Sequence, residues 1–169
     1  MINTEVRKTV RGGRKMTEEE LQDFINTIRY GTLSYVNSEG WPEMRPLNFG
    51  YYNGCYYFHA HKLVGEKLKD WQDGAKVVIN FYETTDKLGV EHINTHKSVL
   101  VYGRLERLDG KRENFEEMKA GIKAMCEAAG TAYKAAPGRL ERNLYGTGVF
   151  KVVPEETIGK MVCFASTPD

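Results

Sequence analysis

Two aromatic-rich runs joined at Asn53-Gly54 constrain the fold of this chain more than any other feature. The first run, WPEMRPLNFGYY, ends directly before this dipeptide, and the second, CYYFHAHK, begins directly after it. Asn-Gly between such runs predicts a tight β-hairpin, because both central residues of the turn must adopt positive φ. We therefore expect two antiparallel strands here, followed by a turn and the start of a helix.

Polar side chains are spaced along this hairpin and just beyond it, at Arg45, Asn48, His59, His61 and Lys67. Alternate residues of a strand share a face, so the side chains of His59 and His61 are expected to point to the same face. Arg45 and Asn48 are expected to lie on opposite faces of their strand. Basic and aromatic groups gathered on one hairpin indicate a binding site for a planar anion.

Length and charge limit the kind of protein that carries this hairpin. The 169 residues suit one domain, which we expect over 16–169 after an N-terminal arm at 1–15. The 24 basic and 23 acidic residues nearly cancel, so we expect neither nucleic acid nor membrane as a partner. No long apolar run or secretory signal is visible, which predicts a cytoplasmic protein. Three cysteines without CxxC spacing are expected to be reduced thiols.

Hydrophobic periodicity predicts two main helices and about seven strands. Residues 84–97 show no periodicity and are expected to form a long loop, while Gly103 predicts a bulge or a bend of the strand. Strands and long helices do not alternate, and no glycine-rich phosphate loop is present, so we expect an antiparallel β-barrel with helices at its edge. Helices are expected at 17–28, 65–71 and 111–129, and the other strands at 32–36, 76–82, 98–108, 147–153 and 157–164.

The phrase GTLSYVNSEGWPEMRPLNFGYYNGCYYFHAHKLVGEKL, with KSVLVYGRLERL before an amphipathic helix, resembles the FMN-binding split-barrel proteins related to pyridoxamine 5′-phosphate oxidase. Within that family it looks most like the nitroimidazole-resistance proteins. The resemblance covers about 16–153. It implies a mainly β fold, an antiparallel split β-barrel with flanking helices. It also implies a homodimer that binds FMN in two clefts at the interface, each lined by both subunits.

The resemblance implies that Arg45 and Lys67 bind the FMN phosphate. Arginine can bind a phosphate through two parallel hydrogen bonds, lysine acts as a compact positive charge, and a helix beginning near Gly65 adds backbone donors. The oxidases carry two basic residues beside a hydroxyl where this chain has Gly65-Glu66-Lys67. Glu66 therefore weakens the match to a true pyridoxamine phosphate oxidase.

Three strand segments complete the cofactor site that the resemblance implies. Two of them belong to the hairpin, and the third reaches the flavin of the partner subunit. The implied residues are Pro46, Leu47 and Asn48 against the isoalloxazine ring, His59 and Ala60 beside the ring and ribityl chain, and Thr95 and Ser98 across the interface.

The implied function is that of an FMN-dependent oxidoreductase. An external donor would reduce the flavin, and a small nitroaromatic or quinone-like compound would accept the electrons; a pyridoxamine 5′-phosphate oxidase-like flavoprotein is a related reading. The flavin supplies the redox chemistry, so no side chain need act as a covalent catalyst. His61, or His59 on the same strand, is the candidate proton donor, because the ordinary histidine pKa of about 6.5 lies near neutral pH.

The sequence is also compatible with two other classes of protein. One is a flavin- or haem-binding protein without turnover, acting as a store, sensor or scavenger. The other is a metal-dependent hydrolase, since His59-x-His61 and His92-x-x-x-His96 are spacings that can bind metal. No carboxylate is spaced with these histidines to complete a set of ligands, so we expect no metal site.

Overall fold

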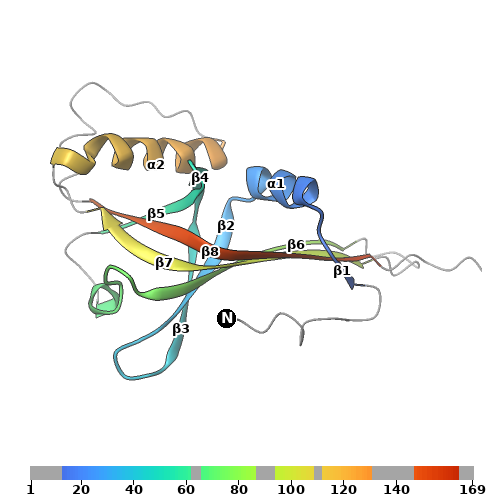
Figure 1. Ribbon diagram of the computed structural model, residues 1–169, viewed down its shortest axis with the longest axis horizontal. Helices are drawn as coiled ribbons and strands as arrows, with labels where there is room; N and C mark the ends of the chain where they lie inside the picture. Colours follow the sequence, from blue (N-terminus) through green and yellow to red (C-terminus); the bar gives the residue numbers. More distant parts are fainter. Residues whose placement is uncertain (1–12, 62–65, 87–93, 109–111, 131–146, 164–169) are drawn as a thin grey trace, which may run out of the picture.

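The computed structural model describes the chain over 13–61, 66–86, 94–108, 112–130 and 147–163 (Figure 1). These segments form eight strands, two α-helices and two 3-10 turns. Their bounds are β1 Gly13–Lys15, α1 Glu18–Thr27, β2 Tyr30–Val36, β3 Pro42–Asn48, β4 Gly50–Tyr52, β5 Cys55–His61, η2 Glu66–Lys69, β6 Lys76–Asp86, β7 Asn94–Leu108, η3 Arg112–Asn114, α2 Phe115–Ala128 and β8 Thr147–Cys163.

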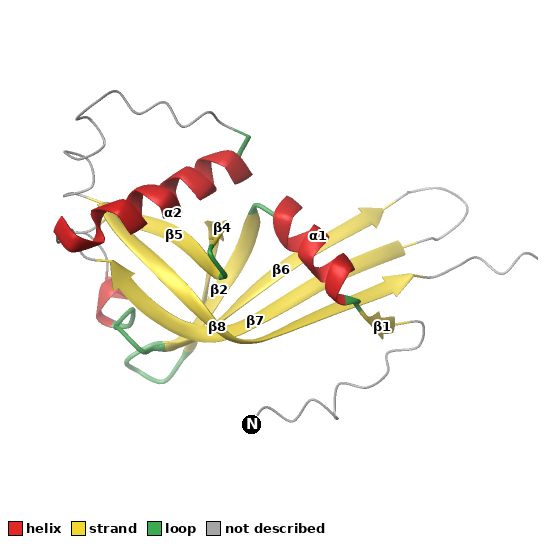
Figure 2. Ribbon diagram, turned by 45° about the horizontal axis from the view of Figure 1, so that its top comes forward, coloured by secondary structure: helices red, strands yellow, loops and turns green. Residues whose placement is uncertain are grey.

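One continuous segment, β3 followed by β4, supplies the strands at both ends of the sheet. The strand order is β3-β2-β6-β7-β8-β5-β4, and β1 adds to β8. β3 pairs with β2, and directly after Phe49 the chain continues as β4, which pairs with β5. Because this run joins the two ends of the order, the sheet curls on itself (Figure 2). The mainly β, antiparallel split barrel expected from the sequence is confirmed.

The turn predicted at Asn53-Gly54 is also confirmed, but only Gly50–Tyr52 of the first predicted strand pairs with β5. The expectation that Arg45 and Asn48 share one hairpin with His59 is wrong, because Pro42–Asn48 pairs with β2. Asn53 has a φ of 47° and Gly54 a φ of 78°, and the neighbouring residues Tyr52 and Cys55 are paired across the turn. Gly50, at the start of β4, is required for a different reason. A Cβ at this position would collide with the backbone of α2 at Met125, so glycine allows the helix to pack directly on the strand.

Aromatic side chains fill the inside of the barrel. Trp71 is fully buried and meets the rings of Tyr35, Phe58 and Phe150 edge-on, with centroids 5.8, 5.3 and 5.3 Å away. Helix α1 closes one side of this core with Phe24 and the following isoleucine. A second, smaller cluster lies under α2 and consists of Tyr57, Leu108, Phe115, Met118 and Val149.

Helix α1 begins as the sequence predicts. Thr17 accepts a hydrogen bond from the backbone N–H of Glu20, and the Glu20 carboxylate accepts one from the backbone N–H of Thr17, so the capping box is complete. The helix ends at its C-cap residue Ile28, in agreement with the expected range. None of the helices in the described segments is long and apolar enough to cross a membrane.

The two strands expected at 147–153 and 157–164 are wrong, because β8 is one continuous strand through Pro154. The pairing of β8 with β7 is irregular at the predicted position, since Gly103 of β7 pairs with Pro154 while the preceding Tyr102 pairs with Glu156. Glu155 is therefore the extra residue. A proline has no N–H for the ladder, and an irregularity in the pairing is where a strand tolerates one.

Two other expected boundaries also change. The long loop expected at 84–97 is wrong at both ends, because β6 continues to Asp86 and β7 begins at Asn94. The strands pair with each other up to these two residues, so their ladder overrides the irregular hydrophobic pattern of the segment. The last three residues of the expected N-terminal arm, Gly13–Lys15, pair with β8 as strand β1.

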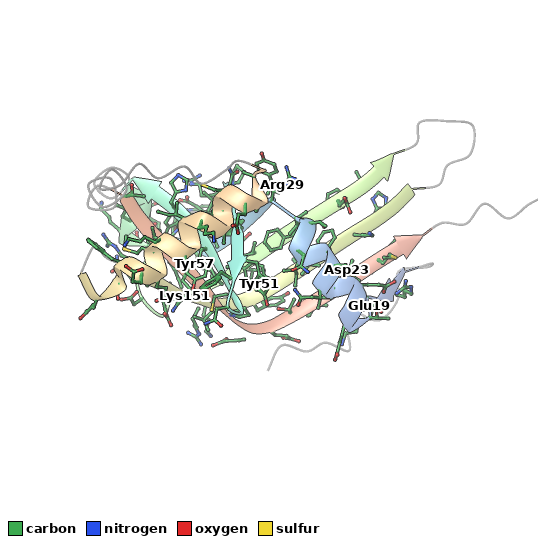
Figure 3. The ribbon with its side chains drawn as sticks, turned by 90° about the horizontal axis from the view of Figure 1, so that it is seen from above. Glu19, Asp23, Arg29, Tyr51, Tyr57 and Lys151 are labelled. Carbon is green, nitrogen blue, oxygen red and sulfur yellow. The ribbon has the colours of Figure 1, made fainter. Side chains whose placement is uncertain are left out.

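A charged cluster joins α2 to the sheet. Lys151 on β8 contacts Glu106 at 2.8 Å and Glu117 at 2.9 Å, and the Tyr57 hydroxyl donates to Glu117 at 2.9 Å (Figure 3). Burial raises the pKa of Glu117, but the hydrogen bonds from Lys151 and Tyr57 outweigh burial and hold the pKa below its usual range. Glu117 is therefore a carboxylate at neutral pH, and its charge stabilises the folded state.

Replacing Glu117 with Gln is expected to lower the thermal midpoint near neutral pH and to change it little in acid. A carboxyl group whose pKa is lowered by folding contributes stability above its unfolded pKa of about 4.3, and this contribution is lost as the pH falls through the folded value. Thermal unfolding at about pH 7 and about pH 3 measures the difference. Glu116→Gln, at an exposed position on the same helix, is the control. An equal loss at both pH values would contradict the assignment.

Candidate functional site

The open edge of β3 is the first component of the candidate site. Within the described segments β3 pairs only with β2. The Phe49 N–H donates to the Arg29 carbonyl and the Asn37 N–H donates to the Trp41 carbonyl, both at 2.9 Å. The backbone N–H and C=O groups of the odd-numbered residues from Trp41 to Phe49 therefore point toward β2. Backbone groups alternate in direction along a strand, so the even-numbered residues of β3 direct theirs to the open edge.

Two prolines agree with this orientation. Pro42 and Pro46 have no N–H, and both occupy even positions, where none is needed for pairing with β2. The N–H groups on the open edge therefore come from Met44 and Asn48, with carbonyl groups of the even residues between them. An open strand edge of this kind can hydrogen-bond a planar ligand that carries alternating donors and acceptors.

Arg45, a predicted phosphate-binding residue, is held by a neighbouring carboxylate. Its Nη2 atom donates to Glu43 Oε2 at 2.6 Å, and Glu43 also accepts from Asn37 Nδ2 at 2.9 Å and from the Tyr35 hydroxyl at 2.8 Å. The hydrogen bonds from Asn37 and Tyr35, with the charge of Arg45, lower the pKa of Glu43. A negative charge therefore lies beside Arg45, whose other guanidinium nitrogens remain as donors.

The faces of β3 follow the predicted alternation. Arg45 pairs across the strands with fully buried Leu33, whereas Asn48 pairs with Tyr30, which is 65% exposed. Arg45 and Asn48 thus lie on opposite faces of one edge strand, as expected. Of the two predicted residues between them, Pro46 is exposed and Leu47 packs against the barrel core.

Two predicted residues of β5, His59 and Ala60, also lie on opposite faces of their strand. His59 is exposed and pairs with Val149, whereas Ala60 is only 9% exposed and belongs to the barrel core. His61 ends β5 and Lys67 lies in η2, and both of their side chains fall outside the described part of the structure. Burial of Ala60 leaves only its backbone available to a ligand.

The predicted residues of β7 are separated from those of β3. Ser98 is half-buried and pairs with Tyr82 and Lys160, while the Thr95 side chain falls outside the described part. Because β7 lies three strands from β3 in the sheet, Ser98 is about 14 Å from the β3 edge at the usual strand spacing of about 4.8 Å. The structure of one chain therefore does not bring Ser98 to the Arg45 end of the site.

The outer face of the sheet is the second component of the candidate site. Side chains on this face alternate with those of the barrel core along β2, β3, β6, β7 and the second half of β8, and no helix in the described segments covers them. A solvated sheet face is usually polar, whereas this face carries many apolar side chains. Its apolar members include Met44, Pro46, Val78, Leu100, Tyr102 and Ile158, none of which is buried.

Sequence reasoning missed two features of this region. The Tyr82 hydroxyl lies 2.8 Å from His96 Nδ1, with the rings stacked 5.9 Å apart on the outer face. Glu43 was not recognised as the partner of Arg45, although the two residues are two positions apart on one strand and therefore share a face. Among the described residues, no three His, Cys, Asp or Glu side chains converge as metal ligands.

A curled antiparallel sheet with an open β3 edge and an uncovered outer face defines a split-barrel protein. The chain belongs to the pyridoxamine 5′-phosphate oxidase family, whose sequence pattern matches residues 17–161. No curated protein sequence matches the chain significantly. The family resemblance expected from the sequence is confirmed.

Solved structures of low sequence identity share the fold. One is a candidate 5-nitroimidazole antibiotic resistance protein from Bacteroides thetaiotaomicron VPI-5482, at 19% identity and a TM-score of 0.68 over 90% of each chain. Another is a FAD-binding protein from Mesorhizobium loti, at 19% identity and a TM-score of 0.63, over 89% of this chain and 98% of that one. A third is a FAD- and haem-binding protein from Mycobacterium smegmatis, at 17% identity and a TM-score of 0.64, over 94% and 76%.

Proposed function

We propose that this protein is a homodimeric flavoprotein that binds FMN along the open edge of β3 and uses it as an oxidoreductase. The observation that carries the proposal is the row of backbone groups at this edge, between Met44 and Asn48. Membership of the pyridoxamine 5′-phosphate oxidase family supports it, as does the flavin bound by two of the relatives. Bound flavin would supply the electron-transfer chemistry.

The edge of β3 fits the polar side of a flavin ring. The pyrimidine part of the ring carries two carbonyl groups on either side of an N–H group. The carbonyl of Pro46 and the N–H of Asn48 are adjacent groups on the open edge, and they provide the complementary acceptor and donor. The exposed Asn48 side chain adds a further polar group beside them. These groups would orient the ring without any movement of the barrel core.

The phosphate of FMN would bind to Arg45, with Lys67 as the second cation. The ion pair between Arg45 and Glu43 opposes this binding, because a carboxylate repels a phosphate. Two of the relatives bind FAD, so FAD is the alternative cofactor. Release of the flavin by denaturation, followed by mass spectrometry, distinguishes FMN from FAD.

The outer face supports the dimer. Apolar side chains on an uncovered sheet face are typical of an interface with another protein. Pairing of two outer faces would bury Leu100 and Ile158, and it would enclose more of a tricyclic ring than a single small barrel can. Ser98, which is distant from the β3 edge of its own chain, would then be available to the flavin of the partner subunit.

The relative linked to nitroimidazole resistance favours a small nitroaromatic compound as electron acceptor. The relative that binds both FAD and haem favours a second candidate, a flavin- or haem-binding protein without turnover. Anaerobic reduction of the purified protein, followed by addition of a nitroimidazole, separates the two. An oxidoreductase should be reoxidised faster by the acceptor than in buffer alone. Purified protein that is colourless and fails to bind added FMN would overturn the proposal.

Replacing Arg45 with Met is expected to weaken FMN binding by about 10- to 100-fold, because a hydrogen bond to a charged group contributes about 1.5–3 kcal/mol. Riboflavin has no phosphate, so its affinity should change little in the same variant. Fluorescence titration with both ligands measures the effect. Arg14→Met, which removes an arginine paired with Glu20 at 2.5 Å and lies outside β3 and the outer face, is the control. Equal losses of FMN and riboflavin affinity would show that Arg45 does not bind the phosphate.

A further inference from the structure

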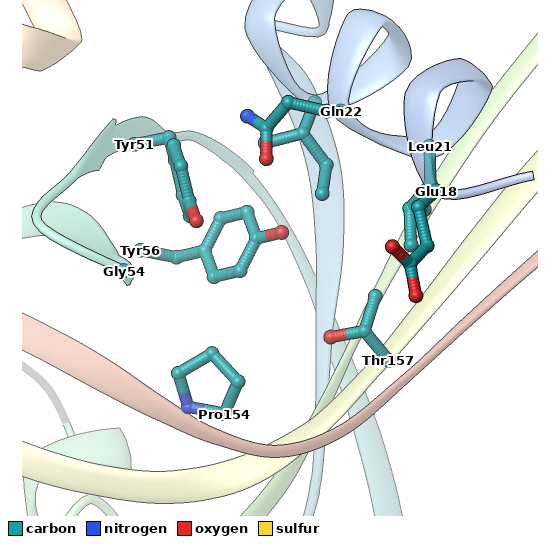
Figure 4. Close-up of a pocket in the computed structure, with 9 residues that line it drawn as sticks. Glu18, Leu21, Gln22, Tyr51, Gly54, Tyr56, Pro154 and Thr157 are labelled. Carbon is teal, nitrogen blue, oxygen red and sulfur yellow. The ribbon is translucent and has the colours of Figure 1, made fainter.

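A pocket of about 310 Å³ lies between α1, the β4–β5 hairpin and β8 (Figure 4). None of its lining residues belongs to β3 or β7, so it is separate from the proposed flavin site. Its volume is at the lower end of the usual range for small-molecule sites, about 300–1,000 Å³. The residues on which its chemistry depends are Glu18, Gln22, Tyr51, Tyr56, Pro154 and Thr157.

The Tyr56 hydroxyl is the central polar group of this pocket. The residue is 2% exposed, and its side chain lines the pocket. Figure 4 shows the hydroxyl directed between Gln22, Glu18 and Thr157. Burial raises the pKa of Tyr56, so it remains a neutral hydroxyl at physiological pH. The hydroxyl faces the pocket, so a bound molecule that hydrogen-bonds to it gains about 0.5–1.5 kcal/mol.

The walls of the pocket are mainly apolar and aromatic. The rings of Tyr51 and Tyr56 lie with their centroids 5.0 Å apart and their planes tilted by 51°. Leu21 and Ile25 of α1 line one side, and the ring of Pro154 lines another. Such walls are suited to the flat ring of a small aromatic compound.

The charge of the pocket selects among aromatic ligands. Glu18 contributes a carboxylate in the first turn of α1, where the helix dipole favours a negative charge. None of the nine lining residues is a lysine, arginine or histidine. Tyrosine ring faces also attract cations. A cationic ligand is therefore favoured over a neutral one, and a neutral one over an anion.

We propose that this pocket binds a small aromatic ammonium compound. The aromatic ring would pack against Tyr51, Tyr56 and Pro154. The ammonium group would donate hydrogen bonds to the Tyr56 hydroxyl and to the Glu18 carboxylate. Binding in this pocket does not depend on the flavin, because no residue of the pocket is assigned to the cofactor.

Titration of the purified full-length protein with three matched probes tests the proposal. Phenethylammonium, 2-phenylethanol and phenylacetate share a ring and differ in the charge of the polar group. The ammonium compound is expected to bind about 10-fold or more tightly than the carboxylate, as one favourable charge contact predicts. Chemical shifts in NMR spectra provide both the affinity and the location. Absence of saturable ammonium binding, or tighter binding of phenylacetate, would overturn the proposal.

Two substitutions locate the site. Tyr56→Phe keeps the ring and is expected to weaken ammonium binding by about 3- to 10-fold through loss of one hydrogen bond. Glu18→Gln is expected to remove the preference for the ammonium compound over the alcohol. This change is at a helix start, so it tests the pocket without disturbing the core. Glu19→Gln, at the adjacent exposed carboxylate outside the pocket, is the control. Wild-type affinity and preference in both pocket variants would overturn the assignment.

Discussion

The Trp71→Ala variant is expected to lose about 3–5 kcal/mol of the free energy of unfolding, the usual cost of truncating a fully buried aromatic residue. Trp71 is completely inaccessible to solvent and contacts the rings of Tyr35, Phe58 and Phe150. These residues come from β2, β5 and β8, so the cavity would loosen the barrel where three strands meet. Small domains are stable by only about 5–15 kcal/mol, and this loss is therefore a large share of the total.

Trp41→Ala is the matched control, because it removes the same side chain from a position that is 68% exposed. Its effect on the free energy of unfolding should stay within about 0.5 kcal/mol. Urea denaturation of both variants at one protein concentration measures the two effects. Similar losses in the two variants would mean that Trp71 is not the centre of the barrel core.

The Leu100→Glu variant is expected to disrupt the proposed dimer and to be a monomer at protein concentrations that favour that dimer. Leu100 lies on the uncovered outer face, with Asn80 and Ile158 as its cross-strand neighbours. A carboxylate buried there without a partner costs several kcal/mol, which corresponds to a dimer at least about 100-fold weaker. Since the proposed flavin cleft needs both subunits, FMN affinity should fall with the dimer.

Sedimentation equilibrium measures the mass of the variant against the 19.3 kDa of one chain. Lys123→Glu, on the exposed side of α2, introduces the same charged group away from the outer face and should leave the dimer intact. A Leu100→Glu protein that stays dimeric would show that another surface forms the interface. A dimer that is lost while FMN affinity is unchanged would show that one chain holds the cofactor alone.

Local sequence signals predicted the parts of the candidate site that depend on neighbouring residues. The alternation along β3 predicted that Arg45 and Asn48 lie on opposite faces, since a strand repeats every two residues. The same signals did not predict that Glu43 pairs with Arg45, because the choice between a solvated and a paired arginine depends on Tyr35 and Asn37. Hydrogen bonds from these two residues hold the Glu43 carboxylate in place.

The sequence by itself determined the Asn53-Gly54 turn and the capped start of α1. Each depends on the conformational preferences of a few adjacent residues. Only the tertiary structure decided that β8 runs unbroken through Pro154, and that Tyr51, Tyr56 and Glu18 line one pocket. Strand register and pocket walls come from residues distant in sequence, which are brought together by burial of the barrel core and not by any local pattern.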